Sequence, residues 1–385
     1  MMSQLKFSHI SAGFIAVLVG YTSSVSIIFQ AAQSLGASQA QLNSWMLVLG
    51  VGMGLSSFTL SLYYRIPVIT AWSTPGAALL VTSLAGVPMS EAIASFIFCG
   101  ILITLCGLSG LFEHLQRYIP NALASAMLAG ILFQFGIAII GAFDNQPLLV
   151  SAMALSYLIL KPIVKNYTIP LVLLVGIASC ISLGLFAHAD IELALPQAVW
   201  VTPEFNINSL ISVAIPLFIV TMTSQNIPGL ATIQAAGYQI SPSGPLTLTG
   251  ITTTLLAPFG GFSYNLAAIT AAICCSKDAD SDRNTRYLAG LTTGVFYLLV
   301  GLAGTAIVSL FAAAPSALVI TIAGLALLPT LGHSLSNALC DEGERDAALV
   351  TFLITVSGLE MLTIGAAFWG LVGGLLTLMI QRGLK

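Results

Sequence analysis

Two stretches of the chain combine hydroxyl residues, proline and glycine in patterns that can present backbone donors to an anion. In the first, Ser73, Thr74, Pro75 and Gly76 are typical of a helix start, with a hydroxyl cap followed by proline in the first turn. The helix N-terminus carries unpaired N–H groups and about half a positive charge. We therefore expect Ser73, Thr74, Gly76 and the following Ala77 to bind an anionic group.

A second stretch, later in the chain, repeats this combination. Residues 258–262 (Pro-Phe-Gly-Gly-Phe) are predicted to be extended, with glycines that allow close backbone approach. Ser263 or Asn265 is predicted to cap a helix that runs to Cys275, so that two helix N-termini face each other. Ordinary short helices with proline and glycine at loop ends are the alternative. The residues predicted to line the site from this stretch are Gly260, Gly261, Phe262, Ser263, Tyr264 and Asn265.

Polar and aromatic side chains elsewhere complete the predicted site. Tyr21 and Ser24 belong to a hydroxyl-rich part of the first apolar segment, where hydrogen bonding between helices is an equally good explanation. Gln225 and Asn226 fall in the middle of a later segment, and buried amides need partners. Trp72 adds an aromatic wall. An apolar pocket with aromatic walls and one charge-holding end suits a small aromatic or amphipathic anion.

Groups that could carry a proton across the membrane are scarce in this chain. Residues 205–276 contain no charged side chain. Proton-coupled carriers usually have a carboxylate or histidine within the membrane. The candidates for a proton relay are His333 and Glu360, both near segment ends.

The elements that must position these residues follow from the composition. Of 385 residues, 57% are hydrophobic and only 6% are charged, whereas about a quarter of a soluble protein is charged. This predicts an all-α polytopic membrane protein without a removable leader. A net charge of −3 excludes the basic surface of a nucleic-acid-binding protein. The six cysteines lack the spacing of a zinc site, so no metal and no cofactor is predicted.

Fourteen apolar segments can be read along the chain. With the N-terminus in the cytoplasm, this count puts all eleven basic residues on the cytoplasmic side, as the positive-inside rule requires, and the C-terminus lies there too. The segments lie near 11–33, 41–63, 74–86, 90–110, 120–142, 147–161, 166–187, 208–231, 243–257, 264–276, 287–311, 315–338, 345–358 and 361–381.

The order of the segments predicts an internal repeat. Seven segments in 1–187, a polar periplasmic linker at 188–207 and seven segments in 208–385 indicate a duplication, and an odd number of crossings inverts the second copy. The third segment of each half, 74–86 and 264–276, is too short to cross alone. Segments three and ten are therefore each predicted to be a short strand followed by a half-helix, with the helix start near the membrane midplane.

Several motifs resemble those of the bacterial benzoate membrane-transport family. Residues 71–80 (Ala-Trp-Ser-Thr-Pro-Gly-Ala-Ala-Leu-Leu) match its signature, as do residues 223–229 and 367–370, and the similarity covers essentially the whole chain. The family is similar to the uracil-transporter fold. The resemblance implies a core domain of 8–115 plus 208–311 that moves against a gate domain of 118–187 plus 314–383. It also implies benzoate–proton symport across the bacterial inner membrane.

One position departs from the uracil-type relatives of that family. They carry a glutamate on segment eight that contacts substrate and proton, whereas Gln225 and Asn226 stand in that region here. An amide can donate hydrogen bonds to a carboxylate, which an ionised acid would repel.

We therefore expect a secondary active transporter of an aromatic carboxylate, a proton symporter that works by alternating access. The substrate is expected between the half-helix N-termini of segments three and ten. The alternatives are a carrier of another small anion or a nucleobase, and an uncoupled facilitator. A channel would need a continuous polar stripe, and an enzyme an activated nucleophile or metal cluster, and neither is found.

Gly370 and Gly374 suggest how copies of the chain could associate. Their spacing of one helical turn allows close helix packing, which would suit a homodimer through the gate domain. Tight packing within one protomer explains the same glycines equally well.

Overall fold

The structure is a computed structural model that describes residues 5–84, 86–110, 112, 120–164, 167–186, 194–359, 361 and 366–383. Within these residues, six helices are long and apolar enough to cross a membrane, and a seventh results if the bent pair Tyr287–Leu302 and Gly304–Ala313 counts as one span. Three further apolar helices are shorter. The chain is therefore a mostly helical membrane protein, as its composition predicts.

The first part of the chain contains the first strand. Its elements are α1 (Phe7–Thr22), α2 (Val25–Ser34), α3 (Gln39–Tyr64), β1 (Thr70–Trp72), α4 (Thr74–Ser83) and α5 (Met89–Ser109). A second group of elements contains the other strand: α10 (Ile207–Ser209), η3 (Leu210–Ala214), α11 (Ile215–Thr221), η4 (Met222–Asn226), α12 (Ile227–Ala235), α13 (Ser243–Leu256), η5 (Ala257–Phe259), β2 (Tyr264–Leu266), α14 (Ile269–Cys275), α15 (Tyr287–Leu302) and α16 (Gly304–Ala313).

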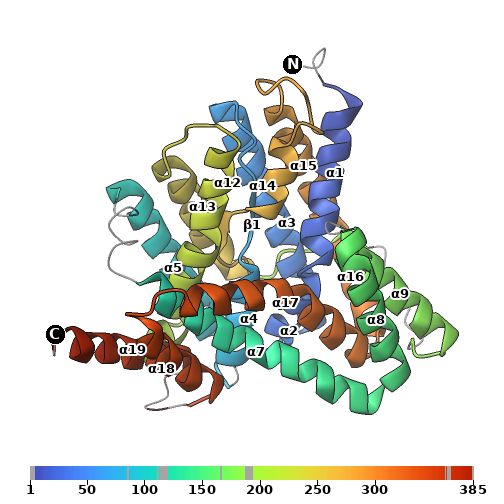
Figure 1. The fold of residues 1–385 in the computed structure, drawn as a ribbon. Helices are drawn as coiled ribbons and strands as arrows, with labels where there is room; N and C mark the ends of the chain where they lie inside the picture. Colours follow the sequence, from blue (N-terminus) through green and yellow to red (C-terminus); the bar gives the residue numbers. More distant parts are fainter. Residues whose placement is uncertain are drawn as a thin grey trace.

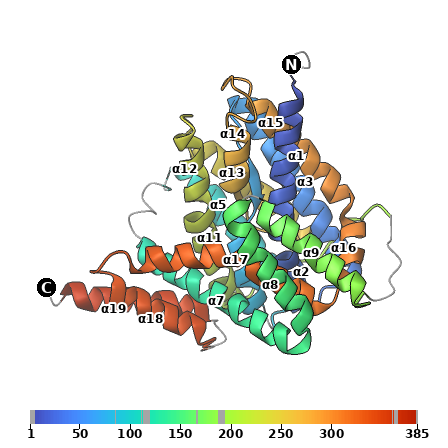
Figure 2. The same cartoon turned by 45° about the vertical axis from the view of Figure 1, so that its right-hand side comes forward.

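The remaining helices comprise one long central pair and two shorter pairs, one on each side of it. They are α7 (Asn121–Asn145), α8 (Pro147–Ile163), α9 (Thr168–Ser182), α17 (Ser316–Leu339), α18 (Arg345–Val356) and α19 (Ala366–Gly383). In Figure 1, α1, α3, α14 and α15 stand upright and α7 and α17 cross beneath them, with α18 and α19 on one side and α8 and α9 on the other. Figure 2 shows the same division after a turn of 45°.

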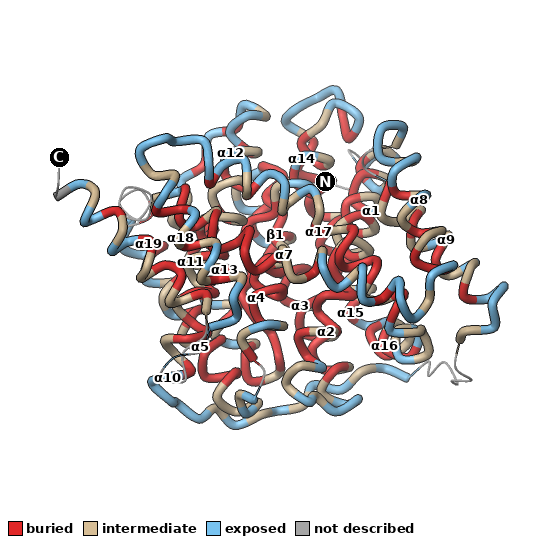
Figure 3. The backbone as a smooth tube through the Cα atoms, turned by 60° about the horizontal axis from the view of Figure 1, so that its bottom comes forward, coloured by how far each residue is buried: buried red, intermediate tan, exposed pale blue. Residues whose placement is uncertain are grey.

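The helix packing pairs segments that are far apart in the sequence. α3 lies along α15, α5 along α13, and α7 along α17, while α8 packs on α9 and α18 on α19. Figure 3 shows the buried parts of the chain gathered around β1, α3 and α4, with exposed parts at the two ends.

A two-stranded antiparallel sheet lies at the centre of the protein. β1 pairs with β2, with Thr70 opposite Leu266 and Trp72 opposite Tyr264. Non-helical backbone inside a membrane protein must be satisfied by other groups. The Thr70 N–H accordingly donates to Ser57 Oγ at 2.9 Å, and the Leu266 N–H donates to Asn226 Oδ1 at 2.9 Å. Neighbouring helices thus hold both strands in place.

The structure confirms the first predicted helix start and corrects the second. Ser73 is the cap of α4, as its sequence predicts. In the second stretch, the predicted extension at 258–262 and the predicted cap at Ser263 or Asn265 are wrong. A 3₁₀ turn ends at Phe259, Gly260 adopts a left-handed φ of 97°, and the extended part is Tyr264–Leu266. Pairing with β1 keeps these residues extended, so α14 begins only at Ile269.

Gly370 and Gly374 pack within the chain. A Cβ atom at either position would overlap a threonine hydroxyl of α18, Thr355 for Gly370 and Thr351 for Gly374. Close packing within one protomer therefore explains these two glycines, and they give no support to a dimer.

Candidate functional site

The candidate site is a cavity of about 380 Å³ where the two strand–helix units meet. It is lined by the last residues of β1 and the first residues of α4, by the start of α14, by η4, and by α1 and α15. Residues 326–333 of α17 form the opposite wall. Among the residues that the structure describes, the lining contains no Asp, Glu, Lys or Arg, so an anion entering it meets no fixed negative charge from them.

Where α4 lines the cavity, Thr74 is the residue that can donate a hydrogen bond to a ligand. Ser73 Oγ accepts a hydrogen bond from the Gly76 N–H at 3.0 Å, and the Ser73 carbonyl accepts one from the Ala77 N–H at 2.7 Å. Pro75 has no N–H to donate. Thr74 and Pro75 line the cavity, whereas Ser73, Gly76 and Ala77 are buried behind them. Of the four residues predicted here, only Thr74 therefore reaches the cavity.

The α14 wall consists of residues that sequence reasoning missed. Ala267, Ala268, Ile269 and Thr270 line the cavity. Ala268 is the cap residue and its side chain has no oxygen to satisfy the first turn. Ala267 and Ala268 likewise bring no hydrogen-bonding side chain to this wall. The signal for this was the Ala267-Ala268 pair, which follows the predicted caps Ser263 and Asn265 by four and two residues.

The six residues predicted from the glycine-rich stretch lie away from the cavity lining. A Cβ at Gly260 would overlap the Trp45 ring, Gly261 is buried, and the Phe262 ring packs 5.8 Å from that of Trp45. Further interactions keep the rest in the interior: Tyr264 Oη donates to the Val48 carbonyl, the Ser263 hydroxyl pairs with that of Thr221, and Asn265 Nδ2 donates to the Ser263 carbonyl. These residues therefore form β2 and the buried turn before it, and none of them lines the cavity.

Trp72 and Ser24 form one polar corner of the cavity. Trp72 Nε1 donates to Ser24 Oγ at 2.8 Å, and Ser24 Oγ donates to the Gly20 carbonyl at 2.9 Å. Both residues line the cavity. The Tyr21 ring lies 4.8 Å from the Trp72 ring, on the buried side of the indole. Tyr21 therefore orients Trp72 and is not itself in the lining.

Gln225 and Asn226 are neighbours in the sequence, but their side chains lie in different surroundings. Both belong to the π-helical turn η4, a feature often found at functional sites. Gln225 lines the cavity. Asn226 is fully buried, and its Oδ1 accepts the Leu266 N–H. Gln225 is thus placed to meet a ligand, and Asn226 holds β2.

α17 contributes a histidine, His333, to the cavity lining. His333 Nε2 lies 3.0 Å from Asn337 Nδ2, one turn further along α17. Pro329, also in the lining, lies inside this helix, where it removes one backbone donor. Thr330 adds a hydroxyl that sequence reasoning missed. The second predicted relay residue, Glu360, lies outside the residues that the structure describes.

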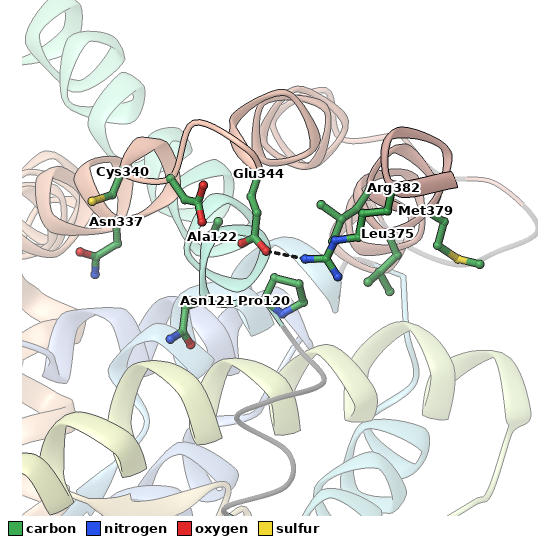
Figure 4. Close-up of a pocket in the computed structure, with 11 residues that line it drawn as sticks. Pro120, Asn121, Ala122, Asn337, Cys340, Glu344, Leu375, Met379 and Arg382 are labelled. Atoms are coloured by element: carbon green, nitrogen blue, oxygen red, sulfur yellow. Dashed lines mark hydrogen bonds and ion pairs between the residues drawn. The ribbon is translucent and has the colours of Figure 1, made fainter. Parts of the chain in front are cut away.

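Two larger cavities lie elsewhere. One of about 680 Å³ lies between the start of α7 and the ends of α17 and α19 (Figure 4). Its charged groups are largely engaged with each other, since Arg382 pairs with Glu344 at 3.0 Å. Another of about 590 Å³ lies between α1 and α14 and shares Ile269 with the candidate site. Among the described residues, no group of His, Cys, Asp and Glu could hold a metal ion.

The fold is shared with solved anion-transporter structures at low sequence identity. The transmembrane domain of the cyanobacterial bicarbonate transporter BicA matches with a TM-score of 0.63 and 15% identity, over 96% of this chain and 97% of that one. The murine anion transporter Slc26a9 in its inward-facing state matches with a TM-score of 0.60 and 12% identity, over 97% of this chain and 68% of that one.

Sequence relatives match along nearly the full length. The inner membrane protein YdcO of Escherichia coli is 49% identical over 94% of this chain and 93% of its own length. The benzoate membrane transport protein of Acinetobacter baylyi is 39% identical over 96% of this chain and 94% of its own. Residues 3–380 match the profile of the BenE family, described as "Benzoate membrane transport protein". The chain is a transport protein rather than an enzyme, and it belongs to the BenE family of benzoate membrane transport proteins.

Proposed function

We propose that this protein is a secondary active transporter of a benzoate-like aromatic carboxylate. The observation that carries the proposal is the 380 Å³ cavity between the starts of α4 and α14, whose described lining residues include no acidic side chain. Its volume falls in the range of small-molecule sites, about 300–1,000 Å³. Trp72 offers an aromatic surface to a ring, and the Gln225 amide and Thr74 offer donors to a carboxylate.

Proton symport is the second part of the proposal. His333 faces the cavity from α17, whereas Thr74 and Gln225 belong to other elements. A relative movement of these elements would change the distance between His333 and a bound carboxylate. Proton relays inside membranes are usually built from carboxylates or histidines, and His333 is the relay candidate in the cavity lining. Glu360 remains the second candidate, and an uncoupled facilitator is the alternative.

The proposed transport mechanism is alternating access by two inverted repeats of seven segments, 1–187 and 208–385. The packing supports this arrangement. If each helix is replaced by its counterpart in the other repeat, the α3–α15 contact becomes the α13–α5 contact, and the α8–α9 contact becomes the α18–α19 contact. The half-helices α4 and α14 occupy equivalent places. We assign 8–115 plus 208–311 to a core domain and 118–187 plus 314–383 to a gate domain. The proposed setting is the bacterial inner membrane with both termini in the cytoplasm.

Uptake of radiolabelled benzoate into proteoliposomes tests the proposal. Accumulation that needs an inward proton gradient and disappears with a protonophore would support symport. Uptake that only equilibrates would indicate an uncoupled facilitator. No uptake of benzoate, together with uptake of labelled uracil or sulfate by the same proteoliposomes, would instead favour a carrier of a nucleobase or another anion and would refute the aromatic carboxylate.

A further inference from the structure

Two buried hydroxyls in the cavity lining have no role in the site described so far. Thr270, the second residue of α14, is 3% exposed, and its hydroxyl has no hydrogen-bond partner among the described residues. Tyr297 of α15 is 2% exposed, and its hydroxyl and the Thr270 side chain both border the same point beside Gly20. The two groups do not reach hydrogen-bond geometry with each other. Both residues line the cavity.

Gly20 of α1 makes room for this pair. A Cβ at Gly20 would lie 3.0 Å from Thr270 Cγ2 and 3.3 Å from Tyr297 Oη. Contacts below 3.4 Å are tight, so a larger residue at position 20 would press on both side chains. The absence of a side chain at Gly20 therefore leaves room for both the Thr270 and the Tyr297 side chain at the cavity surface.

Most serine hydroxyls around the cavity are engaged, which sets Thr270 apart. Ser23 and Ser24 donate to the Gly20 carbonyl, and Ser224 donates to the Val220 carbonyl. A buried hydroxyl without a partner costs free energy, because water satisfies it in the unfolded chain. A ligand that brings a hydrogen-bonding group to Thr270 would recover this cost.

The hydroxyl pair and the Gln225 amide reach the cavity from different walls. Thr270 faces α1 and α15, as its closeness to Gly20 and Tyr297 shows. Gln225 comes from η4, which packs on α11, α12 and β2. A ligand held through its carboxylate by Gln225 and Thr74 can therefore present another part of its ring to the hydroxyl pair.

We propose that Thr270 and Tyr297 form a subsite for a ring hydroxyl, so that the preferred substrate is a hydroxybenzoate. This inference rests on the proposed transport of aromatic carboxylates. A phenol, a threonine and a tyrosine can each donate and accept a hydrogen bond, so a substrate hydroxyl can pair with both side chains. Benzoate would present only C–H groups and leave the Thr270 hydroxyl unpaired. A site built to bind a hydroxyl discriminates against the analogue that lacks it.

Equilibrium binding to the purified full-length protein tests the subsite. The ligands are benzoate and its 2-, 3- and 4-hydroxy derivatives, measured by calorimetry with wild type, Thr270→Val, Thr270→Ser and Tyr297→Phe. We expect wild type to bind at least one hydroxybenzoate about 3- to 10-fold more tightly than benzoate. Thr270→Val and Tyr297→Phe should bring this ratio close to one, and Thr270→Ser should keep it.

Thr293→Val is the matched control. Thr293 is buried on α15, its hydroxyl donates to the Ala289 carbonyl at 2.8 Å, and it is outside the cavity lining. This variant should keep the wild-type ratio, which separates the subsite from a general effect of losing a buried hydroxyl.

Three results would overturn the subsite. Equal affinity of wild type for all four acids would remove the preference itself. An equal loss of affinity for benzoate and hydroxybenzoate in Thr270→Val would place the pair at the carboxylate. An unchanged ratio in both Thr270→Val and Tyr297→Phe would mean that the hydroxyls do not touch the ring substituent. If wild type bound none of the acids, the proposed function would fail as well.

Discussion

Replacing Asn226 by alanine should mainly lower the stability of the protein, whereas replacing its neighbour Gln225 should mainly lower its affinity for substrate. In Asn226→Ala, the Leu266 N–H of β2 loses its acceptor at 2.9 Å in a fully buried place. An unsatisfied buried donor costs about 1–3 kcal/mol. About 1 kcal/mol lowers the melting temperature by roughly 2–4 °C in a domain of moderate size. We therefore expect a loss of several degrees.

In Gln225→Ala, stability should change little and affinity should fall. Gln225 lines the cavity, and a hydrogen bond to a charged carboxylate contributes about 1.5–3 kcal/mol. This corresponds to about 10- to 150-fold weaker benzoate binding.

Thermal unfolding in detergent and benzoate calorimetry measure the two effects. Gln134→Ala and Asn145→Ala are matched controls, because these amides donate to the Val356 and Gly141 carbonyls away from the cavity. The division of roles would be refuted if Gln225→Ala kept its affinity for benzoate while Asn226→Ala kept its melting temperature and lost that affinity. The geometry from which the roles are derived would then be wrong as well.

Three further predictions concern other parts of the structure. Gly260→Ala should greatly lower the yield of folded protein in size-exclusion chromatography, because the left-handed φ of 97° and the Trp45 ring both exclude a Cβ, whereas Gly136→Ala, with open space around it, should behave as wild type. Asp280→Asn should lower the melting temperature at pH 7, because hydrogen bonding from Lys6 and from the Asp282 N–H holds the pKa of the buried Asp280 carboxyl well below its usual range. That stabilisation is complete above the unfolded pKa of about 4 and is lost as the pH falls from there through the folded pKa, so the difference between wild type and variant should stay constant from pH 7 to about pH 4 and shrink below it. A difference that stays the same below about pH 4 would contradict the assignment. His333→Gln should abolish proton-driven accumulation of benzoate in proteoliposomes, and undiminished accumulation would exclude His333 as the relay.

Composition and local patterns were enough to predict the kind of protein and one half of the site. A chain with 6% charged residues cannot cover a surface in water, so the membrane follows from the composition. The start of α4 follows from Ser73 and Pro75, because a helix cap is a contact between residues three positions apart. Trp72, Ser24 and Gln225, which were predicted from their types within apolar segments, do line the cavity, and their contact with substrate remains a prediction.

Tertiary structure decided the other half of the site. The same capping rules put the second helix start at Ser263 or Asn265, but pairing with β1 extends the chain through Leu266 and moves the start of α14 to Ile269. Gln225 and Asn226 are alike in the sequence, and only the packing of η4 against β2 separates the cavity amide from the buried one. Thr270 and Tyr297 come from different helices, so no local pattern could bring their hydroxyls together. Contacts between neighbours in the chain can be read from residue types, whereas contacts between distant segments depend on how the helices pack.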